Sequence, residues 1–424
     1  MTILTIPRKK FEKEVGKLDD KMQEKIAMFG TPVDQLTENE LSIEIFPNRP
    51  DLLSYQNFVY NFKDFLGKKQ QKVNLKLNKP EKNFDVIIDE SVENVRPYTF
   101  CAIVKNLRFD DEKIKEIIDI QEKLHLTLGR KRKKAAIGIY PLEKITLPIR
   151  FTAEKPDKIK FQPLEFDREM TGKQIISQHP TGREYGELLK GFEKYPIFVD
   201  GNNEILSMPP IINSHKTGKI SNETKEVFIE CSGFDLEVLK KILNIIVINF
   251  ILMGGKVYQM NLKYKNKKLI TPDLTPEKMK ISVENINRLL GLELKENDVK
   301  KLLEKMGIEY QSGSASVPAW RTDVLHEVDL IEDVAIAYGY DKFIPEIPEI
   351  STIGEIDKKE IIKEKIRDIL SGLGLLETSS YHLASSEFQF KKMGLKEEKF
   401  VEVETSKTEY KILRQNLTHY LLKI

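Results

Sequence analysis

The sequence predicts a multidomain chain of the mixed α+β class. Its 424 residues exceed what one core usually organises, since single domains commonly contain about 100–200 residues. Short runs rich in β-branched residues alternate with amphipathic helical patterns along most of the chain. A lysine-rich segment at 68–82 and a proline-rich joint at Pro345 and Pro348 interrupt this alternation. We therefore expect several domains connected by polar linkers.

The first predicted domain, residues 1–70, is an N-terminal α/β domain with a structural role. An amphipathic pattern predicts a helix over 8–29, with a break allowed at its internal glycine, followed by a strand over 41–46. The two prolines of PNRPD exclude helix interior there. We expect Asp51 to cap the next helix, which ends at Leu66.

The second predicted domain, residues 84–265, has the composition of an α/β domain. Its helices are expected at 111–126 and 236–253. The apolar run from Leu243 to Met253 contains two asparagines and indicates a buried helix. Four β-branched runs predict strands: Phe84–Ile88, Thr99–Val104, Ala136–Ile139 and Val227–Glu230.

The third predicted domain, residues 269–346, follows the order helix, helix, hairpin, helix. Ser282 is expected to cap the first helix, and Gly307 to end the second. This order is typical of a small winged-helix-like module. The fourth region, 355–424, begins with an amphipathic helix over 357–373 and reads as the start of a further domain.

Composition excludes several classes of protein. Cys101 and Cys231 provide neither a disulfide framework nor a zinc spacing, so we expect a reducing compartment. No apolar run approaches the roughly 20 residues of a membrane-spanning helix, and no secretory signal begins the chain. Phosphate-binding glycine loops and dinucleotide fingerprints are also missing from the sequence. A net charge of +2 neither requires nor excludes nucleic acid.

A cluster of carboxylates is the most pointed candidate site. Asp329, Glu332 and Asp333 have the spacing of one helix face, and Asp323 lies just upstream. Four carboxylates that converge would form an all-oxygen site suited to magnesium. The alternative is that acids near a helix N-terminus favour the macrodipole and keep the helix surface hydrated.

A second candidate site combines two segments, LSMPPIINS and FIECSG. Ser207, Asn213, Glu230 and Ser232 offer hydroxyl, amide and carboxylate groups that could line a pocket and orient a water molecule. No pair of base and nucleophile with a familiar spacing accompanies them. The alternative is that both serines are turn or cap residues.

Three further features have ordinary explanations beside the functional ones. The basic run Arg130–Lys134 could contact nucleic acid, or it could be a hydrated loop. Arg49 could reach a phosphate, or it could belong to a rigid loop. Trp320, the single tryptophan, is expected to anchor a core rather than to stack on bases.

Taken together, the motifs resemble a known family. EIFPNRPDLLS, LSMPPIINS with FIECSG, VPAWRTDVLHEVDLIEDVAIAYGYDK, and LGLLETSSYHL with LRQNL resemble successive landmarks of the phenylalanyl-tRNA synthetase β subunit. The proline-containing LSMPPIINS block is similar to the archaeal and eukaryotic type. The resemblance covers essentially the whole chain, and we expect the chain to be shortened at its C-terminus relative to the family.

The resemblance implies roles for the candidate residues. Asp323, Asp329, Glu332 and Asp333 match the family's magnesium-binding positions near the α subunit. Residues 84–265 match an editing domain that hydrolyses tyrosine wrongly attached to tRNA(Phe), with its pocket at Ser207, Asn213, Glu230 and Ser232. Residues 355–424 match the start of a synthetase-like catalytic fold, a partial antiparallel-sheet domain without its chemistry.

The resemblance also implies partners. In the family, an α subunit binds ATP and phenylalanine, and an (αβ)2 heterotetramer attaches phenylalanine to tRNA(Phe) in the cytoplasm. No membrane partner is expected. Two departures put editing in question: Tyr140-Pro141 stands where relatives carry His-Asp, and Ser232 stands where relatives carry threonine. A stand-alone editing deacylase and a non-catalytic tRNA-binding assembly module therefore remain alternatives to the subunit.

Overall fold

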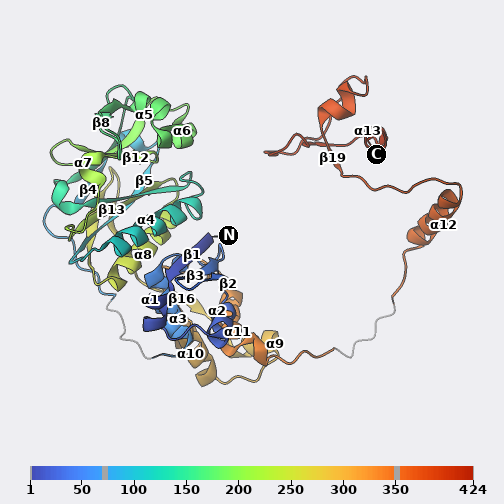
Figure 1. Cartoon of the computed structure of the whole chain (residues 1–424), viewed down its shortest axis with the longest axis horizontal. Coiled ribbons are helices and arrows are strands. Elements are labelled where there is room, and N and C mark those ends of the chain that lie inside the picture. Colours follow the sequence, from blue (N-terminus) through green and yellow to red (C-terminus); the bar gives the residue numbers. More distant parts are fainter. Residues whose placement is uncertain (1, 69–74, 348–353, 424) are drawn as a thin grey trace. The chain divides into compact units, whose positions relative to one another are not determined.

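The computed structural model describes residues 2–68, 75–347 and 354–423 (Figure 1). The chain divides into two compact units, Met1–Ile344 and Pro345–Ile424, so one boundary falls at the predicted proline-rich joint. Part of the lysine-rich linker (69–74) and Pro348 lie outside the described residues. One large mixed sheet and several small ones confirm the mixed α+β class. The finer division of residues 1–344 into three domains stays a prediction.

The N-terminal region is a small antiparallel sheet of order β1-β3-β2, packed with helices. The predicted helix over 8–29 is two helices, because α1 ends before Gly16, whose φ of 129° few other residues adopt. Asp51 does not cap the helix α3; the Ser54 side chain accepts from the backbone N–H of Asn57 instead. The elements are β1 (Thr2–Pro7), α1 (Arg8–Glu14), α2 (Asp20–Met28), β2 (Val33–Leu36), β3 (Glu40–Ile45), η1 (Pro50–Leu52) and α3 (Tyr55–Phe65).

A ten-stranded sheet forms the middle of the chain. Its order is β12-β11-β10-β7-β4-β14-β5-β13-β6, with β15 paired to β14, and β4 runs parallel to both β7 and β14. The strands are β4 (Asp85–Ile88), β5 (Tyr98–Lys105), β6 (Ala135–Pro141), β7 (Ile149–Glu154), β10 (Tyr195–Val199), β11 (Ile205–Met208), β12 (Ile212–Asn213), β13 (Val227–Gly233), β14 (Lys256–Lys263) and β15 (Lys268–Thr271). Because β15 belongs to this sheet, the sheet continues beyond the predicted boundary at residue 265.

Helices α4 (Asp111–Leu126) and α8 (Leu236–Leu252) lie along one face of this sheet (Figure 1). The buried run of α8 confirms the predicted core helix, and its asparagines have partners outside the helix. Asn249 Oδ1 accepts from the Ser54 hydroxyl at 2.9 Å, and Asn244 Nδ2 donates to the Asp273 carbonyl at 2.9 Å. These bonds pair one polar atom of each amide, whereas Asn244 Oδ1 and Asn249 Nδ2 have no hydrogen-bond partner among the described residues.

A small subregion lies next to β12 at the edge of the sheet. Its elements are β8 (Lys160–Phe161), β9 (Met170–Thr171), α5 (Gly172–Gln178), α6 (Pro180–Tyr185) and α7 (His215–Gly218). Its apolar residues, among them Ile159 and Ile175, pack in one core with Ile197 of β10 and Met208 of β11.

Residues 277–342 contain the three predicted helices and the predicted hairpin, β17 with β18. A further strand that was not predicted, β16, pairs with β18 and completes an antiparallel sheet of order β16-β18-β17. Ser282 caps α9, and Gly291 ends it in the left-handed conformation. Trp320 is buried, as expected of a core anchor. The elements are β16 (Glu277–Lys280), α9 (Val283–Leu290), α10 (Glu296–Lys305), β17 (Glu309–Gln311), β18 (Ser314–Val317), α11 (Glu327–Tyr338) and η5 (Tyr340–Lys342).

The second unit has a small core formed by Ala384, Phe390 and Ile412. Its elements are α12 (Lys358–Gly372), β19 (Leu383–Ala384), η6 (Glu387–Lys391), β20 (Ile412–Leu413) and α13 (Thr418–Leu421). Helix α12 confirms the predicted amphipathic helix, yet none of its residues is buried by the described parts of the chain. Within those same parts, no helix is long and apolar enough to cross a membrane.

Candidate functional site

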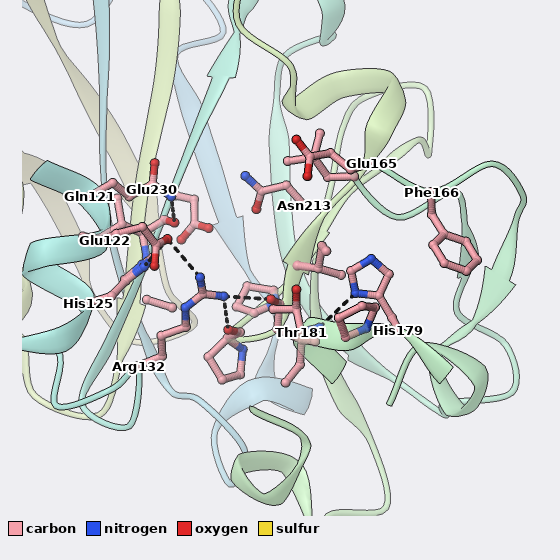
Figure 2. A pocket seen from close by; sticks show the side chains of 18 residues that line it. Gln121, Glu122, His125, Arg132, Glu165, Phe166, His179, Thr181, Asn213 and Glu230 are labelled. Atoms are coloured by element: carbon pink, nitrogen blue, oxygen red, sulfur yellow. Dashed lines mark hydrogen bonds and ion pairs between the residues drawn. The ribbon is translucent and has the colours of Figure 1, made fainter. Parts of the chain in front are cut away.

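A cavity of about 460 Å³ lies between the large sheet and the small subregion at its edge (Figure 2). One wall comes from α4 and from the neighbouring strands β6 and β13. The facing wall comes from residues 164–166, 179–181 and 209–213. The predicted pocket segments LSMPPIINS and FIECSG therefore meet at this cavity, although more than a dozen residues separate them in the sequence.

Glu230 is the buried carboxyl of the cavity. Register pairing on β13 places it opposite Gly138 of β6 and Cys101 of β5. Its Oε1 lies 3.2 Å from the Tyr140 hydroxyl, whereas Oε2 has no hydrogen-bond partner in the described parts of the chain. Burial raises the pKa of Glu230 to about 8, although the charge of Arg96 opposes the rise. Glu230 is therefore mainly a neutral carboxylic acid at pH 7.

Asn213 also lines the cavity, and the two serines do not. The Ser207 side chain is fully buried, where β11 pairs with β12 and Ser207 stands opposite Asn213. The Ser232 hydroxyl accepts from Arg96 Nε at 3.1 Å, and the carbonyl of Ser232 accepts from Arg96 Nη2 at 2.6 Å. Of the four predicted pocket residues, Asn213 and Glu230 line the cavity, and Ser207 and Ser232 do not.

Two residues at the cavity were not singled out from the sequence. Arg132 was seen only as part of a basic run, yet its guanidinium donates to Glu122 at 3.0 Å and to the carbonyl of Ile211 at 2.9 Å. His125 is buried, and its Nε2 accepts the backbone N–H of Ile137 at 2.8 Å. Burial lowers the pKa of His125, so the ring is neutral near pH 7. No sequence spacing distinguishes this histidine from the other five.

Around Arg132 the chain adopts an unusual turn. Arg130, Lys131 and Arg132 have φ values of 47°, 53° and 63°, a left-handed conformation that few side chains adopt. Arg132 fixes the turn to the cavity wall, and Arg130, Lys131 and Lys133 remain exposed. We call residues 130–134 the basic turn. It carries exposed positive charge next to the cavity mouth.

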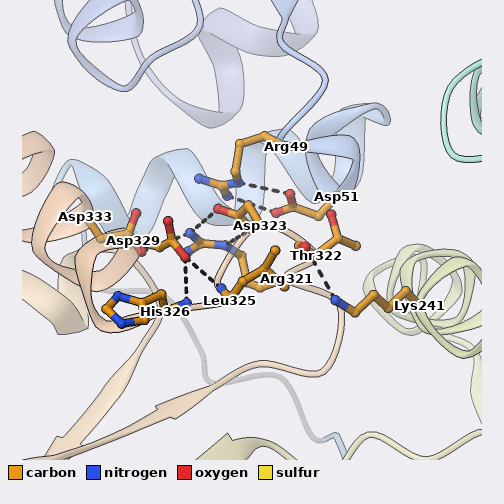
Figure 3. A network of polar contacts seen from close by, with 10 residues as sticks. All are labelled: Arg49, Asp51, Lys241, Arg321, Thr322, Asp323, Leu325, His326, Asp329 and Asp333. Carbon is orange, nitrogen blue, oxygen red and sulfur yellow. Dashed lines mark hydrogen bonds and ion pairs between the residues drawn. The ribbon is translucent and has the colours of Figure 1, made fainter. Parts of the chain in front are cut away.

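The predicted carboxylate cluster is organised around an arginine (Figure 3). Arg321 donates to both oxygens of Asp323, at 2.8 and 2.7 Å, and to Asp333 Oδ2 at 2.9 Å. Asp329 Oδ2 instead accepts the backbone N–H groups of Leu325 and His326 at the start of α11, each at 2.8 Å.

This arrangement does not offer the four carboxylates to one ion. Glu332 is exposed, and no group of three His, Cys, Asp or Glu side chains among the described residues could hold a metal. Burial alone would raise the pKa of Asp323, but hydrogen bonds and charge from Arg321 bring it below its ordinary value. These residues do not fit magnesium unless Arg321 is displaced, so a magnesium site here stays a prediction.

Arg49 does not project toward solvent. It is buried, and its guanidinium forms a two-pronged ion pair with Asp51, at 3.0 and 2.9 Å, next to the Arg321 cluster (Figure 3). The PNRPD motif therefore supplies a structural ion pair rather than an exposed phosphate ligand.

Comparison with known proteins first defines the class. Residues 279–340 match the family described as the tRNA synthetase B5 domain, and residues 91–246 match the B3/4 domain. Residues 344–424 match the phenylalanyl tRNA synthetase beta chain CLM domain. The chain thus consists largely of domains found in an aminoacyl-tRNA synthetase.

The particular family follows from whole-chain similarity. The phenylalanine–tRNA ligase beta subunit of Archaeoglobus fulgidus is 35% identical over 432 residues, which cover 100% of this chain and 78% of that protein. The beta subunit of Thermococcus sibiricus is 42% identical over 361 residues, 84% of this chain. This chain belongs to the family of phenylalanine–tRNA ligase beta subunits, as the sequence motifs indicated. It spans 64% of the length of the Thermococcus relative.

A solved structure has the same fold. An N-terminal fragment of the phenylalanyl-tRNA synthetase β subunit from Pyrococcus horikoshii superposes with a TM-score of 0.75 at 35% sequence identity. The match covers 80% of this chain and 100% of that fragment.

Proposed function

We propose that this chain acts as the β subunit of a phenylalanine–tRNA ligase, in an (αβ)2 heterotetramer that attaches phenylalanine to tRNA(Phe). The observation that carries the proposal is the order of B3/4, B5 and CLM matches along 91–424. The α subunit would hold ATP and phenylalanine. Residues 269–346 would form the winged-helix-like domain, and 355–424 the start of the catalytic-like domain. The complex would work in the cytoplasm, where the bulk of translation takes place.

The exposed apolar side of α12 supports a protein partner. Ile362, Ile366 and Ile369 are 58%, 50% and 63% exposed, on one side of the helix. Contiguous apolar surface of this kind usually marks an interface. We expect the α subunit to cover it.

The cavity supports an editing role for residues 84–265. Ester hydrolysis needs a water molecule held beside the carbonyl carbon, and positioning alone contributes strongly to such a reaction. The neutral carboxyl of Glu230 and the amide of Asn213 can orient that water or the aminoacyl group by hydrogen bonds. In this role no side chain becomes covalently attached to the substrate.

The test is co-expression with an α subunit of the same family. We expect the two chains to elute as one complex of two copies each and to charge tRNA(Phe) with labelled phenylalanine. Ile366→Asp/Ile369→Asp should prevent assembly, because it places charge in the proposed interface. The matched control is Ile118→Asp, which changes an exposed isoleucine of α4 (56% exposed) and should leave assembly intact. Failure of the wild-type chains to associate would contradict the proposal.

Two alternatives have their own supporting features. The cavity suits a deacylase that works without an α subunit, and hydrolysis of tyrosyl-tRNA(Phe) by the chain alone would favour it. The basic turn suits a tRNA-binding module without catalysis. Binding that weakens steeply with salt, without hydrolysis or assembly, would favour that alternative.

A further inference from the structure

The Tyr140 side chain occupies a central position among the predicted pocket residues. It lies on β6 with its ring fully buried and stacked on Phe228 at 5.8 Å between centroids. Its hydroxyl oxygen lies 3.2 Å from Glu230 Oε1 and 3.3 Å from Asn213 Oδ1. Glu230 and Asn213 are the two predicted pocket residues that reach the cavity. A phenol of the protein itself is therefore bonded to both.

The glycine at position 138 of β6 leaves room for the Tyr140 side chain. Gly138 precedes Tyr140 by two residues on the same face of β6, opposite Glu230. A methyl group added to Gly138 would overlap the Tyr140 hydroxyl oxygen and crowd Glu230 Oε1. The absence of a side chain at Gly138 thus creates the space in which the hydroxyl meets the carboxyl.

The Tyr140 hydroxyl faces one oxygen of each neighbour, Glu230 Oε1 and Asn213 Oδ1. Tyr140 has one hydroxyl hydrogen, which cannot serve both acceptors at once. The hydroxyl therefore donates to Glu230 Oε1 or to Asn213 Oδ1, one at a time. Its oxygen lies where a ligand hydroxyl would have to lie to reach these two atoms. Among the described residues, Glu230 Oε2 has no hydrogen-bond partner.

This balance bears on selectivity. A site distinguishes tyrosine from phenylalanine when its buried polar groups pair with the hydroxyl and stay unpaired without it, which gives discrimination of up to about 10⁴–10⁵-fold. Here Glu230 Oε1 and Asn213 Oδ1 face the Tyr140 hydroxyl whichever aminoacyl group enters. A ligand hydroxyl therefore cannot form an exclusive pair with these two oxygens.

We propose that Tyr140 is a resident phenol that takes the hydroxyl-recognition position of this cavity, so that the cavity does not prefer tyrosyl over phenylalanyl groups. The inference rests on the proposed editing function, because that function defines the ligand. Tyr140 acts as a specificity-determining residue, because its hydroxyl occupies the hydrogen-bonding positions at Glu230 Oε1 and Asn213 Oδ1. Removal of its ring would leave a phenol-shaped space bordered by both.

The experiment uses the full chain and two stable probes, adenosine carrying tyrosine or phenylalanine through a 3′-amide. Binding of each probe is measured by calorimetry at pH 7. We expect the two affinities of the wild type to agree within about fivefold, since discrimination needs unpaired polar groups. Tyr140→Ala should bind the tyrosyl probe more than about tenfold tighter than the phenylalanyl probe. The matched control is Tyr140→Phe, whose ring still fills the space and which should stay within about fivefold.

Each outcome decides one question. A wild-type preference for the tyrosyl probe above about fivefold overturns the inference, and this result needs no variant. A folded Tyr140→Ala chain without a tyrosyl preference also overturns it, as does a Tyr140→Phe chain that gains one. If Tyr140→Ala does not fold, the wild-type and Tyr140→Phe ratios still decide. Failure of wild type and variants to bind either probe counts against the proposed editing function itself.

Discussion

Replacement of Arg321 should destabilise the first unit strongly. Arg321→Met keeps most of the side-chain length and removes the charge that pairs Asp323 and Asp333. Asp333 is 3% exposed, so it would remain buried without its ion-pair partner. Removal of one member of a buried ion pair typically costs about 3–5 kcal/mol, because the remaining charge is neither hydrated nor paired. We expect a loss of unfolding free energy in that range.

Trp320 provides the assay. It is the single tryptophan, it is buried, and it precedes Arg321 in the chain, so its fluorescence reports unfolding of this region. For a urea slope of about 1–3 kcal/mol per molar, the expected loss lowers the midpoint by roughly 1–5 M. Lys190→Met is the control: it breaks the pair with Glu187, whose two side chains are 73% and 76% exposed, and should cost about 1 kcal/mol or less.

A second variant separates buried charge from lost packing. Arg321→Met/Asp333→Leu removes both the arginine and the deeper carboxylate, so it should recover at least half of the lost stability. If the double variant is as unstable as Arg321→Met, or if Arg321→Met behaves like Lys190→Met, the reasoning from buried charge is refuted.

Three further predictions concern the middle of the chain. The pKa of Glu230 is about 8 in the folded chain and 4.5 when unperturbed, so the folded chain holds this proton up to a higher pH. The resulting contribution to the unfolding free energy is full below pH 4.5 and is lost as the pH rises to about 8. Glu230→Gln should remove this part of the pH dependence of Tm. Gly182→Ala should cost about 1–3 kcal/mol in urea unfolding, because its methyl group would overlap a backbone carbonyl, whereas Gly372→Ala meets open space and should be tolerated. Lys131→Glu/Lys133→Glu should weaken tRNA binding and lower the slope of log K against log salt by roughly 2, as measured by salt titration.

Local patterns predicted the elements whose boundaries depend on local chemistry. Ser282 caps α9 as predicted, because its hydroxyl accepts the backbone N–H of Asn285 at the start of the helix. The helix over 8–29 was predicted with a break allowed at Gly16, and the structure confirms the break, because the backbone turns at this glycine. Ser54 rather than Asp51 caps α3, since Asp51 is held by Arg49, and one-dimensional spacing does not show which of two capping residues already has a partner.

The candidate sites show the same limit more sharply. Spacing placed Asp329, Glu332 and Asp333 near one face of α11, yet burial separates them: Asp333 faces Arg321, and Glu332 faces solvent. Arg321 immediately precedes Thr322 and Asp323 in the RTD motif, so the charge that pairs the carboxylates was visible in the sequence. The sequence did not show that the Arg321 side chain would point toward Asp333. The two residues are twelve positions apart, and their bond depends on how the loop packs against the helix.

Tyr140 shows both what the sequence reveals and what only the three-dimensional contacts reveal. The sequence marked it as a departure, and the departure alone only questioned editing. In the structure the hydroxyl reaches Glu230 and Asn213, and Gly138 makes the space for it. A residue of the wrong type could have destroyed the pocket by steric overlap, but the cavity remains, with one oxygen each of Glu230 and Asn213 facing the Tyr140 hydroxyl. The departure therefore changes which ligand groups the cavity can distinguish while it keeps the cavity itself, and selectivity can be lost separately from the capacity to bind.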